Sequence, residues 1–224
     1  MYTQIKKLLK TFVGKLIFVI AFVAAFWVVK EGKQAFVHST AMENASVKAA
    51  ETINQEIQTA QAQATSTKSA TDVLAERAKK NADATLAATN TDKQKRVVAS
   101  NFFFGAYFLN TRTRPAYCAS LGEPIPSFAK AYESHHRNLF NAAERIQIQD
   151  FKDHKAEYDI EKFYALFSPS TEKVVAQDMK DAALALKMSE KEICSSMQQN
   201  ANVWVKEMDY QKQVPDVAQL LLKN

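Results

Sequence analysis

Two cysteines, Cys118 and Cys194, are the residues of this chain whose type and number indicate a covalent cross-link. An even pair of widely separated cysteines is typical of one disulfide in a protein delivered to an oxidising compartment. In a chain that stays in the cytoplasm, the same pair would be two unrelated buried thiols. We therefore expect a Cys118–Cys194 disulfide, on the condition that the chain is exported.

Glu133 and His136 have the spacing of a metal-binding motif, because positions three residues apart place a carboxylate and an imidazole on one helical face. Di-iron helical bundles need this motif twice, together with two further carboxylates. The second copy is missing, since Phe151 stands three residues before His154. We expect no metal and no other cofactor, and interpret Glu133 and His136 as part of a solvated polar face.

No side chain stands in a sequence context that activates a catalytic nucleophile. The chain contains no Gly-x-Ser-x-Gly motif, no glycine-rich phosphate loop and no His-Glu-x-x-His motif. Both cysteines are better explained by a disulfide than by catalysis. The sequence therefore predicts a protein that is not an enzyme.

Arg112, Arg114 and Tyr117 are the best candidates for contacting a ligand or a partner. They belong to residues 110–127, which contain three of the five prolines and one of the four glycines of the chain. This composition predicts the principal loop of the fold. Loops held by a rigid scaffold often carry binding residues, and a disulfide through Cys118 would restrain this one.

Residues 11–29, TFVGKLIFVIAFVAAFWVV, contain a single charge, Lys15, and predict a membrane anchor. A helix needs about 20 predominantly apolar residues to cross a bilayer, so this segment is just long enough. Lys6, Lys7 and Lys10 precede it and no acid does, which places the N-terminus in the cytoplasm. We expect a single-pass protein of a bacterial inner membrane, with its C-terminal domain in the periplasm.

A cleaved signal peptide is the alternative to an uncleaved anchor. Val23, Ala24 and Ala25 form a small-residue cleavage site after a basic start and an apolar core. The apolar run continues to Val29 instead of giving way to a polar segment, which favours the anchor. Cleavage near Ala25 would instead secrete the protein to the periplasm.

The net charge of +5 does not indicate binding to nucleic acid. Residues 1–29 contain four lysines and no acid, so the remainder carries 29 − 4 = 25 basic residues against 24 acidic ones. The excess of positive charge therefore lies in the N-terminal segment that orients the chain in the membrane, and does not indicate a phosphate-binding surface. The expected partners are the lipid bilayer, through residues 11–29, and either a second copy of the chain or another envelope protein.

The composition favours an all-α fold, because four glycines and five prolines are too few for a strand-rich protein of 224 residues. Residues 1–30 are assigned to a cytoplasmic basic tail and the transmembrane anchor. Residues 31–94 are Ala-rich and predict a helical stalk or hairpin with a weak heptad seam. Polar stretches at 65–69 and 89–92 are the places where this segment can fold back, so a straight stalk and a hairpin both remain open.

Residues 95–224 predict a compact extracytoplasmic helical domain closed by one disulfide. Its central helix is expected at residues 95–110, where aromatic side chains are dense. One further helix is expected to start at Ser127. A second is expected to end at Ser168-Pro169, where a third begins, and a fourth is expected to start at Ser189 with a Ser189–Glu192 capping box.

These features predict a structural or interaction module that is anchored in the membrane and positions its C-terminal binding domain in the cell envelope. The alternative function is binding or sensing of a small ligand or lipid in the periplasm. In that alternative, the loop from Arg112 to Tyr117 would act as a lid over the ligand.

Overall fold

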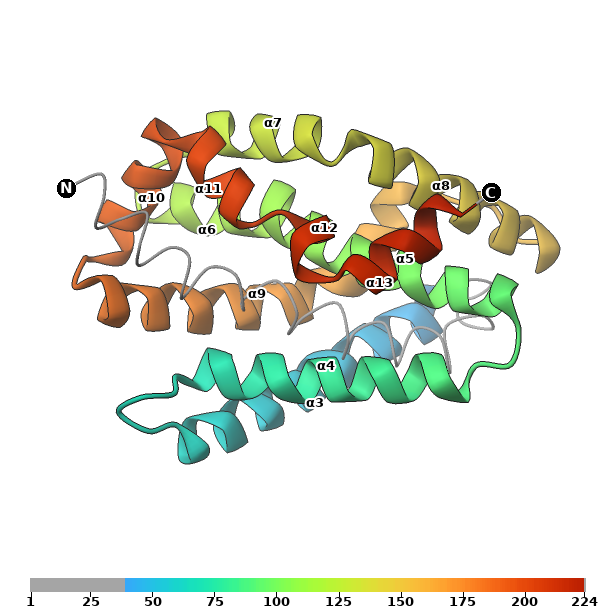
Figure 1. The fold of residues 1–224 in the computed structure, drawn as a ribbon, viewed down its shortest axis with the longest axis horizontal. Coiled ribbons are helices and arrows are strands. Elements are labelled where there is room, and N and C mark those ends of the chain that lie inside the picture. Colours follow the sequence, from blue (N-terminus) through green and yellow to red (C-terminus); the bar gives the residue numbers. More distant parts are fainter. Residues whose placement is uncertain (1–38, 224) are drawn as a thin grey trace.

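The computed structural model describes residues 39–223, with side chains from Ser46 onward, and over this range the fold is all-α. Helices α3 (Ser39–Gln63) and α4 (Ala70–Ala88) form a hairpin on one side of a larger helical body (Figure 1). The predicted anchor at residues 11–29 lies outside the described residues. In the described part of the chain, no helix is both long enough and apolar enough to cross a membrane.

The body is built around α5 (Asp92–Phe108), which continues through the π-helix η2 (Leu109–Thr113) into α6 (Arg114–Ser120). The remaining helices are α7 (Pro126–His135), α8 (Arg137–Asp153), α9 (Ile160–Leu186), α10 (Glu190–Gln199), α11 (Ala201–Glu207), α12 (Tyr210–Gln213) and α13 (Pro215–Leu222). In Figure 1, α7 and α8 lie on one side of α5 and α6, whereas α9 lies on the other side, towards the hairpin.

Aromatic side chains of α5 fill the centre of the body. Phe103 and Phe104 are both 0% exposed. The Phe104 ring meets Phe163 of α9 edge-on, with centroids 5.2 Å apart, and Phe103 meets Tyr210 of α12 in the same way at 5.3 Å. Burial of each such ring contributes about 1.5–3 kcal/mol, and edge-to-face contacts are a preferred geometry. The prediction of a central aromatic helix is confirmed.

The chain folds back at residues 64–69, the first of the two predicted places, so the hairpin and not the straight stalk is observed. The Thr65 N–H donates to the Lys68 carbonyl across the turn at 2.9 Å. Ser69 then starts α4 through a capping box with Asp72. Because these side chains satisfy backbone N–H groups that a new helix leaves free, the turn is encoded locally.

The seam of the hairpin packs against α9 of the same chain. Ile53 and Ala60 of α3 and Ala78 of α4 are at most 1% exposed. One polar contact fixes the register between hairpin and body: the buried Asp181 carboxylate on α9 accepts hydrogen bonds from the Thr71 N–H at 2.8 Å and from its hydroxyl at 2.6 Å. The hairpin is therefore part of the body's packing.

The prediction of a long loop at residues 110–127 is wrong, because residues 109–120 are helical. Pro115 is the second residue of α6, directly after the π-helix η2. The connection is confined to residues 121–125, where Gly122 adopts a positive φ of 80° that other residues rarely take. The disulfide consequently restrains a helix and not a loop.

Pro169 does not separate two helices as expected, since α9 runs through it from Ile160 to Leu186. A proline inside a helix removes one hydrogen bond and costs about 3 kcal/mol. Burial on both sides of the proline offsets this cost, because Phe167 and Val175 are 0% exposed. The predicted helix from Ser127 is also divided, at His136, into α7 and α8.

We predict that Thr71→Val destabilises the protein by roughly 1–3 kcal/mol, because it removes one of the two hydrogen bonds that Thr71 donates to the buried Asp181 carboxylate. The matched control is Thr85→Val, whose hydroxyl donates only to the Asn81 carbonyl of its own helix. Urea unfolding of both variants checks this. Equal effects for the two substitutions would contradict the role given to Asp181.

Candidate functional site

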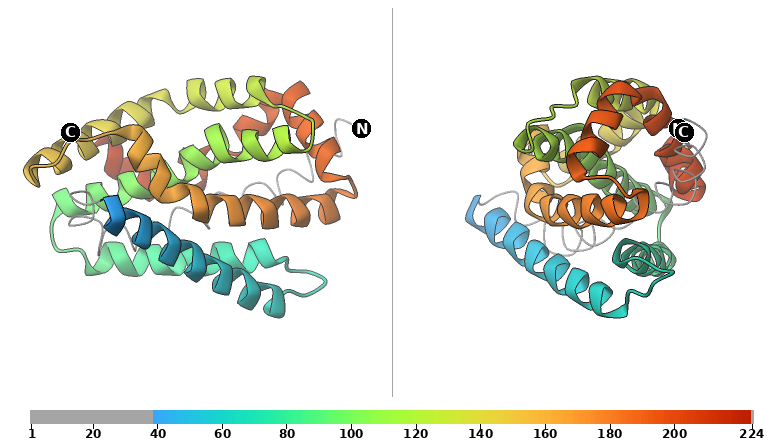
Figure 2. Two further views of the ribbon diagram at one scale, coloured as in Figure 1. Left: turned by 180° about the vertical axis from the view of Figure 1, so that it is seen from behind. Right: turned by 90° about the vertical axis from the view of Figure 1, so that its left-hand side faces the viewer.

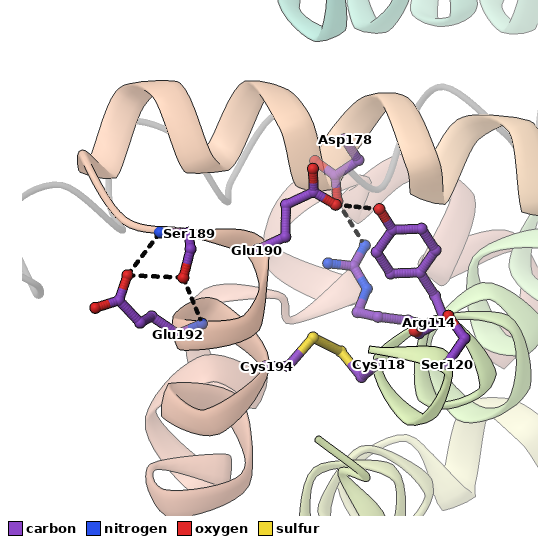
Figure 3. The surroundings of a disulfide bond; sticks show 9 residues. Arg114, Cys118, Ser120, Asp178, Ser189, Glu190, Glu192 and Cys194 are labelled. Atoms are coloured by element: carbon purple, nitrogen blue, oxygen red, sulfur yellow. Dashed lines mark hydrogen bonds and ion pairs between the residues drawn. A yellow bond between two sulfur atoms is a disulfide. The ribbon is translucent and has the colours of Figure 1, made fainter. Parts of the chain in front are cut away.

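Cys118 of α6 and Cys194 of α10 form the predicted disulfide, with Cα atoms 5.6 Å apart (Figure 3). Both residues are 0% exposed. The bond joins α6 to the first turns of α10 and closes a stretch of chain that contains α7, α8 and α9. Its position in the core makes it a structural bond, because solvent does not reach the sulfur atoms.

The structure gives Arg112 and Tyr117 partners within the protein. The Arg112 guanidinium forms two hydrogen bonds with the Glu161 carboxylate, at 2.5 and 2.8 Å, and stacks over the Tyr164 ring. The Tyr117 hydroxyl donates to Glu190, the first residue of α10. Neither side chain lies on a loop, so the proposed lid over a ligand is not formed.

Arg114, the third residue of this set, forms an ion pair with Asp178 of α9 at 2.9 Å (Figure 3). The contact is close, but its geometry is that of an ion pair and not of an aligned hydrogen bond. The two side chains are 3% and 1% exposed. Burial raises the pKa of Asp178 to about 7, because lost solvation outweighs the attraction of Arg114. The pair therefore orders the start of α6 against α9 and offers no charge to a ligand.

His135, His136 and Asp209 bring three atoms of metal-binding type within 4.8 Å of one another. Sequence reasoning did not find this cluster, because Asp209 lies far along the chain from the two histidines. However, both His136 ring nitrogens are engaged: Nδ1 donates to the Tyr132 carbonyl at 3.0 Å, and Nε2 accepts from the Tyr210 N–H at 3.1 Å. The remaining two ligands are too few for a stable site, so the cluster is structural.

The strongest candidate for a binding site is a groove of about 390 Å³ between the first turns of α5, the middle of α8 and the end of α13. We call it the basic groove. Its charged lining residues are four bases and one acid, namely Lys93, Arg96, Arg145, Lys223 and Asp92. Apolar atoms from all three helices form its floor, including Val97, Ile146 and Leu220.

The four bases of the basic groove differ in how far the protein neutralises them. Lys93 contacts Asp153 at 2.5 Å, and this carboxylate raises the pKa of Lys93. The Nε atom of Arg96 is buried and has no hydrogen-bond partner in the described part of the chain. Arg145 and Lys223 are exposed, and neither has an ion-pair partner among residues 39–223. The exposed cationic groups of Arg145 and Lys223 therefore remain available to an anionic ligand.

The basic groove was not predicted from the sequence. Lys93 and Arg96 are close together in the chain, but Arg145 and Lys223 join them only when α8 and α13 pack against α5. The near balance of charge over residues 30–224 hides this local excess. Comparisons of the chain with protein-family models, curated proteins and solved structures find no match.

We predict that His136→Ala costs roughly 3 kcal/mol at pH 7.5, because it leaves the buried Tyr210 N–H unpaired and removes one of the two hydrogen bonds to the Tyr132 carbonyl. Burial lowers the pKa of His136 to about 4. The native imidazole thus contributes stability above its unfolded pKa of about 6.5 and loses it as the pH falls through about 4. The cost of the substitution should consequently shrink between pH 7.5 and pH 4.5.

The control for this prediction is His154→Ala. His154 also contacts the carbonyl four residues earlier, at 2.7 Å, but its side chain is 40% exposed. Urea unfolding at both pH values should show a small and nearly constant effect for this variant. A pH-independent loss in His136→Ala would contradict the account of its buried neutral ring.

We predict that the double variant Cys118→Ala/Cys194→Ala loses about 4 kcal/mol of unfolding free energy, because a bond over this many residues restricts the unfolded chain. Urea unfolding of the variant and of the oxidised native protein measures the difference. Full reduction of the native protein should shift its transition in the same direction. An unchanged transition midpoint would show that the bond does not stabilise the fold.

Proposed function

We propose that this protein is an extracytoplasmic interaction module, anchored in the membrane by residues 11–29, whose helical body binds another component of the cell envelope. The observation that carries the proposal is the buried Cys118–Cys194 bond. Such bonds persist in oxidising compartments and are rare in the cytoplasm. The apolar segment at residues 11–29 offers the route by which the body reaches such a compartment.

The hairpin changes how the body is positioned in this proposal. Because α3 and α4 pack on each other and on α9, they do not extend the body away from the membrane. Nine residues, 30–38, lie between the proposed anchor and the first residue of α3. A fully extended chain of that length reaches about 30 Å. The body is therefore proposed to lie near the membrane surface.

Binding is proposed in preference to catalysis because of what the basic groove contains. Its lining supplies cationic side chains and apolar surface, but no Ser, Cys or His that could act as a nucleophile or a base. Cationic groups that lack an ion-pair partner among the residues the structure describes, such as Arg145, favour an anionic group on the ligand. The basic groove is accordingly the proposed contact surface.

The placement of the chain is tested by alkaline carbonate extraction of membranes and by protease treatment of spheroplasts, with an affinity tag at the C-terminus. We expect the full chain to stay in the membrane pellet, and the tag to be degraded without lysis of the spheroplasts. Ile20→Arg should reduce retention, because an arginine at a helix centre costs about 2.5–3.5 kcal/mol on membrane insertion.

Leu184→Arg serves as the control, because Leu184 is 79% exposed on α9 and tolerates a charge. This variant should be retained like the unmodified chain. Release of the unmodified chain by carbonate, or a tag that resists protease until lysis, would overturn the proposed placement.

A further inference from the structure

We propose that the basic groove binds the phosphate groups of anionic phospholipids at the membrane surface. This inference rests on the proposed function, because it takes residues 11–29 as the anchor that holds the body near a bilayer. It adds the identity of the envelope component that the basic groove contacts. Three observations carry it: the position of the groove in the molecule, its unpaired cationic groups, and the exposed apolar side chains beside it.

The first observation is that the basic groove and the start of α3 lie towards the same end of the molecule. The left-hand view of Figure 2 shows α3 beginning towards the end of the long axis at which α5 starts and α8 and α13 finish, whereas the right-hand view shows the start of α3 and the end of α13 on opposite sides of the molecule. The nine residues that precede Ser39 are too few to carry this end far from an embedded segment. The end that contains the basic groove is thus the end closest to the bilayer.

The second observation is the supply of hydrogen-bond donors without acceptors. Arg96 has a buried Nε–H with no hydrogen-bond partner in the described residues. Arg145 offers an exposed guanidinium group, which donates in a planar fork that matches two phosphate oxygens, and Lys223 adds a second exposed cation. The lining carries four bases against Asp92, and Asp153 neutralises Lys93 from outside, so a net positive charge remains.

The third observation is the presence of aliphatic side chains next to these cations. Ile148 of α8 is 47% exposed and Leu222 of α13 is 46% exposed. Ile148 lies three residues after Arg145 on α8, a spacing that places both side chains on one helical face, and Leu222 immediately precedes Lys223 in the chain. Cationic groups beside exposed aliphatic groups are typical of surfaces that lie at the interface of an anionic membrane. A soluble acidic partner would explain the charges, but not their place at the anchored end.

The proposal is tested by hydrogen–deuterium exchange of the full chain reconstituted in nanodiscs. One set contains phosphatidylcholine alone, and another contains increasing fractions of phosphatidylglycerol. We expect residues 92–97 and 142–149 to exchange more slowly as the anionic fraction rises. In Arg145→Gln/Lys223→Gln, the required fraction should rise, because each base near an anionic surface is worth about a fivefold change in affinity.

Lys162→Gln/Lys173→Gln is the matched control, since both residues are exposed on α9 and line no part of the basic groove. It should behave like the unmodified chain. Equal responses of the two double variants, or no protection at any anionic fraction, would overturn the inference. Protection in detergent by inorganic phosphate alone, or by polyglutamate but not by lipid, would also overturn it in favour of a soluble anion or an acidic protein.

The same data separate this inference from the proposed function. Slow exchange of residues 11–29 in both types of nanodisc, with an unprotected basic groove, would leave the anchored module standing and remove only the lipid contact. Rapid exchange of residues 11–29 in every nanodisc would instead remove the anchor, and with it the reason for placing the basic groove against a bilayer.

Discussion

The covalent bond between Cys118 and Cys194 is the constraint on which the rest of the body depends. It encloses α7, α8 and α9 in one closed stretch of chain, so the oxidised chain has less conformational freedom when unfolded. The restriction of the unfolded chain contributes about 4 kcal/mol. This stabilisation helps to offset the desolvation cost of the buried ion pair between Arg114 and Asp178. The attraction between the two charges compensates only partly for their removal from water.

The basic groove is built from elements on both sides of this closed stretch. Arg96 comes from α5 before it, Arg145 from α8 within it, and Lys223 follows α13 beyond it. The contacts of α13 with α5 and α8 hold these three parts together. The His136 ring adds a link from the start of α8 to the backbone of α12. The basic groove, whose charged residues come from distant segments of the chain, therefore depends on the buried contacts that hold these helices together.

The parts of the structure that were predicted from the sequence are those set by local chemistry. The capping box at Ser189 uses side chains that satisfy nearby backbone groups, so neighbouring residues suffice to identify it. The turn at residues 65–69 was one of two places at which the sequence allowed the chain to fold back, and the sequence left the choice between hairpin and straight stalk open. The errors lie where tertiary packing decides. Pro169 and Pro115 looked like breaks, yet burial and position let helices pass through them. The basic groove needs the final fold, because charge balance along the chain conceals it.

The central claim is that an anchored chain carries an oxidised helical body outside the cytoplasm. Its most direct test is the intact mass of the full protein, purified from membranes and alkylated under denaturing conditions without reduction. The account predicts a chain that retains residues 11–29 and takes up no alkyl group, because Cys118 and Cys194 are bonded to each other. A chain that begins after Ala25, or one that carries two alkyl groups, would contradict it.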